Sequence, residues 1–115
     1  MTRLLMLPVL LIASVSSATA GNDFPTLDRV MFVETCMRDH ADRPRQEMMY
    51  KCSCALDAIA SQVPYDDFVE LSTALEAGQI AGERGAAVRE STEGRDMAKR
   101  FRTIRAKAFS SCLIQ

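Results

Sequence analysis

The sequence contains a single histidine, His40, and none of the local motifs that build common catalytic or cofactor sites. It has no Gly-x-Ser-x-Gly segment, no glycine-rich phosphate loop, no calcium-binding loop and no Cys-x-x-Cys-His segment for covalent haem. A catalytic triad that contains a histidine would have to use His40, and no nucleophile motif elsewhere in the sequence supports such a triad. We therefore expect a protein that is not an enzyme and carries no cofactor.

The chain also has no strong excess of either charge. Its formal net charge is −1, which becomes −2 when Arg3 is removed with the N-terminal segment described below. A near-neutral protein is not expected to bind nucleic acid or an anionic membrane as its main partner. Signals for β-strands are missing as well, because no run alternates with period two and no Asn-Gly or Asp-Gly turn occurs. These absences indicate an all-α protein.

The first 20 residues have the three-part pattern of a secretory signal peptide. Arg3 supplies the positive charge, residues 4–15 form an uncharged apolar run, and the small residues that follow end in an Ala-x-Ala cleavage site at Ala20. The apolar run is too short to span a membrane. We predict that residues 1–20 are cleaved and that residues 21–115 form one exported domain, with no membrane span in the mature chain.

Apolar side chains recur at helical spacing in the mature chain. Thr26 is expected to cap a first helix that ends in a loop over residues 39–44. Its apolar stripe is Leu27, Val30, Val33 and Met37. A second helix is predicted over residues 46–63, with the clearest stripe in the protein. That stripe is Met49, Cys52, Leu56, Ile59 and Val63.

Two further helices complete the prediction. The third begins after Pro64 and ends at Gly78, with Phe68, Leu71 and Leu75 on one side. The last begins near Ala86, is weakened by Gly94 and continues to the C-terminus. Its stripe is Met97, Phe101, Ile104, Ala108 and Cys112. The sequence thus predicts a small, disulfide-stapled bundle of about four helices.

All four cysteines, Cys36, Cys52, Cys54 and Cys112, lie in the mature part of the chain. An even number of cysteines in a short exported protein indicates a disulfide framework. Cys52 and Cys54 are one residue apart in the second predicted helix, so their side chains project about 200° apart. While that segment is helical, the two sulfurs can neither bond each other nor hold one metal ion.

Cys52 and Cys54 are therefore expected to pair with two different helices, through Cys36 of the first and Cys112 of the last. Both Cys52 and Cys112 lie on apolar stripes, which favours a bridge between them and a second bridge from Cys36 to Cys54. The pairing of Cys36 with Cys52 and of Cys54 with Cys112 stays open.

A copper site is the sharpest cofactor hypothesis that the sequence offers. Soft ligands that suit cuprous copper gather in one region of the chain. They are Met37, His40, Met48, Cys52 and Cys54. Met37 also falls where the helical pattern requires a core residue, and methionine fills irregular cores without any metal. We expect no bound metal and keep a copper-handling or thiol-redox protein as an alternative.

Charge is unevenly distributed along the mature chain. Residues 57–83 contain six acids and no Lys or Arg, whereas residues 95–107 contain six bases and one acid. Such helices can neutralise each other or face water. The functional interpretation is a basic docking face for an acidic exported partner. That face would consist of Arg95, Lys99, Arg102 and Arg105.

Three short segments carry a resemblance to a group of proteins. They are Phe32-x-x-x-Cys36, Tyr50-Lys51-Cys52-Ser53-Cys54 and Tyr65-Asp66-Asp67-Phe68-Val69-Glu70. With these segments, residues 28–112 resemble small exported four-cysteine helical proteins of proteobacteria, some of which accompany periplasmic quinoprotein alcohol or methanol dehydrogenases. The resemblance implies a periplasmic location and an accessory role, and it transfers no catalytic residue.

The leading functional hypothesis is accordingly a non-catalytic periplasmic protein that binds another periplasmic protein, such as an exported dehydrogenase. The acidic stretch over residues 57–83 supports one more alternative. Acid would protonate these carboxylates and loosen the fold, giving a periplasmic chaperone that binds unfolded chains.

Overall fold

The computed structural model describes residues 23–115, so the predicted signal peptide lies outside the described residues. This part of the chain forms five helices and no strand, which confirms the all-α prediction. The helices are α1 (Thr26–Asp39), α2 (Arg45–Ala60), α3 (Tyr65–Gly78), α4 (Glu83–Glu90) and α5 (Thr92–Ser111). None of the helices in residues 23–115 is long and apolar enough to cross a membrane.

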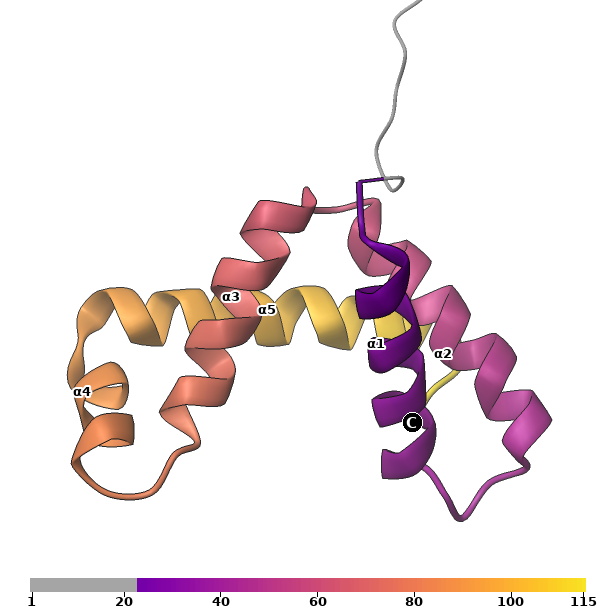
Figure 1. Cartoon of the computed structure of the whole chain (residues 1–115), viewed down its shortest axis with the longest axis horizontal. Helices are drawn as coiled ribbons and strands as arrows, with labels where there is room; N and C mark the ends of the chain where they lie inside the picture. The colour runs from indigo at the N-terminus through magenta and orange to yellow at the C-terminus, as the bar shows by residue number, and fades with distance from the viewer. Residues whose placement is uncertain (1–22) are drawn as a thin grey trace, which may run out of the picture.

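Helix α5 is the longest element and connects the two halves of the fold (Figure 1). The α1–α2 hairpin lies at its C-terminal end, where α2 packs on α5, and α3 and α4 pack on its N-terminal part. Helix α1 makes its main helix contact with α2, and α1 and α3 have no extensive packing against each other. Helices α1 and α3 are therefore separated over most of their length.

The predicted count of four helices is wrong because the chain turns sharply between α4 and α5. Ser91 caps α5, since its side-chain oxygen accepts a hydrogen bond from the Gly94 N–H at 3.0 Å. A Cβ on residue 94 would lie 2.5 Å from the Val88 carbonyl oxygen, so the turn requires glycine there. Gly94 thus permits a helix boundary, whereas the sequence analysis placed it inside one weakened helix.

The apolar core follows the predicted stripes of α2, α3 and α5. One cluster surrounds Ile59, Val63, Leu71, Leu75 and Phe101, and a second surrounds the disulfide between Cys36 and Cys52. Met49 departs from the predicted stripe, because it is exposed and the neighbouring Met48 is buried instead. Met48 lies four positions before Cys52 and so continues the same buried face into the second cluster.

Helix α1 buries only the second half of its predicted stripe, Val33 and Met37. Leu27 and Val30 of the predicted stripe are exposed, and the buried residues are Cys36 and Met37 near the end of the helix. Thr26 is also the first helical residue rather than the cap, because Pro25 occupies the capping position. The periodicity therefore identified the helix and part of its packed side, which also carries Phe32 and Cys36.

The C-terminus folds back after α5. Leu113 adopts a left-handed backbone with φ of 59°, and the Ile114 N–H donates to the Phe109 carbonyl at 2.9 Å. This Schellman-type turn satisfies the last helical carbonyls and directs Ile114 into the cluster around the Cys36–Cys52 bridge. The chain end is thereby attached to the α1–α2 hairpin.

Candidate functional site

A groove lies between α1 and α3, with α5 as its floor. It has a volume of about 480 Å³ and is open to solvent. We call it the α1–α3 groove. The aromatic side chains that line it are Phe32 from α1, Tyr65 and Phe68 from α3, and Phe101 and Phe109 from α5. Figure 1 shows that α1 and α3 approach each other at their N-terminal ends and diverge toward their C-terminal ends.

The inner part of the groove is a chain of aromatic contacts that joins three helices. The Phe68 ring lies 6.5 Å from the Phe32 ring and 5.7 Å from the Phe101 ring, both in edge-on geometry. Such edge-to-face pairs are favourable beyond their buried area. These rings make the inner part of the groove apolar. Met31 on α1 and Val69 on α3 form its two rims and are 58% and 41% exposed.

The narrow end of the groove is closed by polar contacts that join α1 and the segment before it to α3. The Tyr65 hydroxyl donates to the Asp28 carboxylate at 2.8 Å, and the Tyr65 backbone N–H donates to the Asp23 carboxylate at 2.7 Å. The Asp28 carboxylate raises the pKa of the Tyr65 phenol, because the hydrogen bond and the negative charge both favour the protonated form. These contacts fix the angle between α1 and α3.

This arrangement predicts that Tyr65 titrates above the ordinary tyrosine pKa of 10.0. Because the folded-state pKa is raised, the stabilisation from this contact is complete below the unfolded pKa and is lost as pH rises through the folded pKa. Absorbance at 295 nm in the Tyr50→Phe variant measures Tyr65 alone, since the chain has two tyrosines. Adding Asp28→Asn should move the midpoint back toward 10, and an unchanged midpoint would contradict the assignment.

The wide end of the groove carries unpaired charge. Asp39 on α1 and Glu76 on α3 are exposed, and neither forms an ion pair or a side-chain hydrogen bond within residues 23–115. Arg105 lies on the floor, where its guanidinium stacks over the Phe109 ring at 4.8 Å. With Asp28 at the narrow end, three carboxylates and one guanidinium line the groove.

The four residues of the predicted basic docking face do not all line the same depression of the surface. Arg105 lines the α1–α3 groove, whereas Arg95, Lys99 and Arg102 line a hollow beside α3 and α4. Arg95 is used within the fold, since its guanidinium donates to the carbonyls of Arg89 and Glu90 at the end of α4. Lys99 and Arg102 are exposed, with no ion pair in the described part of the chain. Docking through these residues stays a prediction.

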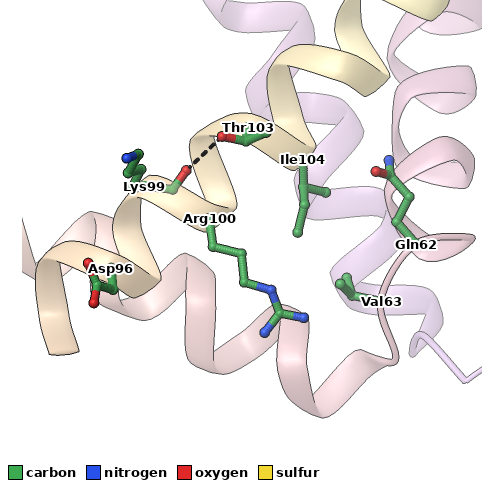
Figure 2. Close-up of a pocket in the computed structure, with 7 residues that line it drawn as sticks. All are labelled: Gln62, Val63, Asp96, Lys99, Arg100, Thr103 and Ile104. Atoms are coloured by element: carbon green, nitrogen blue, oxygen red, sulfur yellow. Dashed lines mark hydrogen bonds between the residues drawn. The ribbon is translucent and has the colours of Figure 1, made fainter.

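A further hollow lies where the end of α2 faces α5 (Figure 2). Arg100 extends from α5 toward Val63, while the Lys99 side chain points away. The Arg100 guanidinium lies 3.6 Å from the Asp67 carboxylate of α3, an exposed ion pair of small energetic value. The hydroxyl among the residues that line this hollow, that of Thr103, donates a hydrogen bond to the Lys99 backbone carbonyl at 3.1 Å within α5.

The acidic stretch over residues 57–83 takes part in two ion pairs between helices. Asp57 accepts from Arg29 of α1 at 3.1 Å, and Asp67 pairs with Arg100 of α5. Protonation of these carboxylates would remove both contacts, which is the loosening that the acid-activated chaperone hypothesis requires. Nothing beyond these exposed pairs favours that hypothesis, and it stays a prediction.

The four cysteines form two disulfides, Cys36–Cys52 and Cys54–Cys112. The pairing favoured in the sequence analysis, Cys52 with Cys112 and Cys36 with Cys54, is therefore wrong, and the pairing that was left open is present. Cys52 faces α1 and is fully buried, whereas Cys54 is exposed and reaches the end of α5. The divergence of the two side chains is confirmed, because they hold different helices.

The residues of the copper hypothesis are not arranged as a ligand set. Both cysteines are oxidised, so they supply no thiolate. The His40 ring nitrogen Nδ1 donates to the Cys36 carbonyl at 2.8 Å and thereby caps the end of α1. Met37 and Met48 lie in the apolar cluster around the Cys36–Cys52 bridge. No three His, Cys, Asp or Glu side chains of residues 23–115 converge as they would around a metal ion.

Comparison of the chain with protein-family models, with curated proteins and with solved structures finds no match. The fold and the site together define the class of protein: a small all-α protein with two disulfides and a groove lined by aromatic side chains. The sequence pattern did not predict this groove. The pattern gave apolar positions in α1 and α3, but it did not indicate that these two helices lie apart and leave a groove between them.

Proposed function

We propose that this chain is a non-catalytic, exported interaction module of the periplasm and that it binds another periplasmic protein through the α1–α3 groove. The observation that carries the proposal is an apolar floor with exposed apolar side chains on both rims, Met31 and Val69. Exposed apolar surface next to a groove is typical of protein interaction sites. An accessory role toward an exported dehydrogenase is the partner class that the resemblance implies.

The disulfides support the export part of the proposal, because paired cysteines persist in oxidising compartments. They also support a binding rather than a redox role, since residues 23–115 contain no free thiol. Intact mass measurement checks both points. The mature protein should begin at Gly21, and alkylation should modify four thiols only after reduction.

Site-specific photo-crosslinking in the native host tests the binding site. A photoreactive phenylalanine analogue at Val69, on the groove rim, should give a covalent adduct of defined mass with another protein. The same analogue at Tyr50, an exposed aromatic residue of α2 outside the groove, is the matched control. Adducts at both positions, or at neither, would overturn the groove as the binding site.

A further inference from the structure

The groove also specifies the chemistry of its partner. We infer that the α1–α3 groove binds one amphipathic helix of a partner protein, whose apolar face is flanked by basic residues. This inference rests on the proposed function, because it names the kind of segment that the proposed binding site accepts.

The walls of the groove favour a helix over an extended segment. Both walls are α-helices, whose backbone groups are used within the helices themselves. An extended peptide would find no free backbone donors or acceptors there, and its own amides would lose water without gaining partners. A helix satisfies its backbone internally and presents only side chains. Apolar side chains of such a helix would contact Phe68 and Phe101 on the floor and Met31 and Val69 at the rims.

The charges at the wide end favour basic flanks on that helix. Asp39 projects from α1 and Glu76 from α3, so one unpaired carboxylate lies on each wall of the groove. The one cation in the groove, Arg105, is stacked on Phe109 and lies on the floor rather than at a rim. A partner with a cation on each flank of its apolar face can reach both carboxylates. An acidic partner would be repelled by them.

Fluorescence titration with synthetic helices tests this inference directly, because the chain contains no tryptophan. Two helical peptides share one apolar face with a single Trp and differ only in their flanks, which are Lys in one and Glu in the other. We expect saturable binding of the Lys-flanked peptide, at least about fivefold tighter than the Glu-flanked one at low salt, as two exposed ion pairs allow. The difference should shrink at high salt.

Three double variants, one of them a control, separate the contributions of charge and apolar contact. Asp39→Asn with Glu76→Gln should abolish the preference for the Lys-flanked peptide. The control pair Asp66→Asn with Glu70→Gln, exposed acids of α3 outside the groove, should preserve it. Met31→Ser with Val69→Ser should weaken both peptides equally, and since both side chains are exposed the fold should be retained, as circular dichroism would show.

Each remaining outcome overturns a defined part of the inference. Equal affinity for the two peptides, or tighter binding of the Glu-flanked one, would overturn the basic partner and leave the crosslinking result intact. Absence of binding by both peptides would overturn the helix as occupant. If crosslinking at Val69 fails as well, the proposed function itself is wrong.

Discussion

Replacing Cys54 and Cys112 together by alanine will lower the free energy of unfolding by about 4 kcal/mol. The bridge joins residues 58 positions apart and is the covalent link between α2 and the end of α5. Without it the unfolded chain gains the entropy of a long open loop, which the native state does not share. A loss of this size is a large share of the stability of a domain this small.

The native state should also change locally in this variant. Cys112 and Ile114 are buried together against the α1–α2 hairpin, and the bridge holds them there. Amide hydrogens after Phe109 should therefore exchange faster, while those of α3 stay protected. Chemical denaturation and hydrogen exchange measure the two effects.

The second disulfide provides the comparison. Cys36 and Cys52 are only 16 positions apart, so loop closure accounts for about 3 kcal/mol. Both residues are buried, and their replacement by alanine also removes packed sulfur atoms from the core. A loss below about 1 kcal/mol in the Cys54→Ala, Cys112→Ala variant would contradict the entropic argument, whatever the Cys36–Cys52 variant shows.

Replacing Phe24 by alanine will lower the free energy of unfolding by about 3 kcal/mol, although it lies just outside the first helix. Its ring is 4% exposed and lies 5.3 Å from the Tyr65 ring and 5.0 Å from the Phe68 ring. The ring therefore joins the segment before α1 to the start of α3. Its loss leaves a cavity at the narrow end of the groove, where surrounding side chains are held by the Tyr65–Asp28 hydrogen bond.

Leu27→Ala is the matched control for this prediction. Leu27 lies three positions further along and is 67% exposed, so its truncation should change the free energy of unfolding by less than about 0.5 kcal/mol. Thermal and chemical unfolding of both variants check the difference. Equal losses, or a greater loss for Leu27→Ala, would show that the start of the chain packs differently.

Helical spacing predicted the buried residues of some helices better than those of others. This spacing predicted the buried positions Cys52, Leu56 and Ile59 of α2 and Val63 just after it, because one stripe of that helix faces the core throughout. In α1 the same spacing was right for Val33 and Met37 and wrong for Leu27 and Val30. Leu27 and Val30 face solvent because the packed face of α1 carries Phe32 and Cys36 beside Val33 and Met37. Phe24 was missed since it precedes any helical period.

Helical spacing could not predict the disulfide pairing. Spacing established that Cys52 and Cys54 point in different directions, which is a local property of one helix. The choice of partner for each depends on which helix lies on which side of α2. Apolar character indicated only that Cys52 is buried, and burial against α1 or α5 is equally compatible with that pattern.

The all-α class and the paired cysteines could be predicted from the amino-acid sequence, because helical periodicity is a local property and the number of cysteines is a matter of composition; export stays a prediction from the N-terminal segment. The disulfide pairing, the division of α4 from α5 and the existence of the α1–α3 groove depend on how the helices pack. The groove depends on the angle between two helices that hardly touch, and that angle is set by contacts distant in sequence, from Asp23 and Asp28 to Tyr65. Periodicity within one helix carries no information about such contacts.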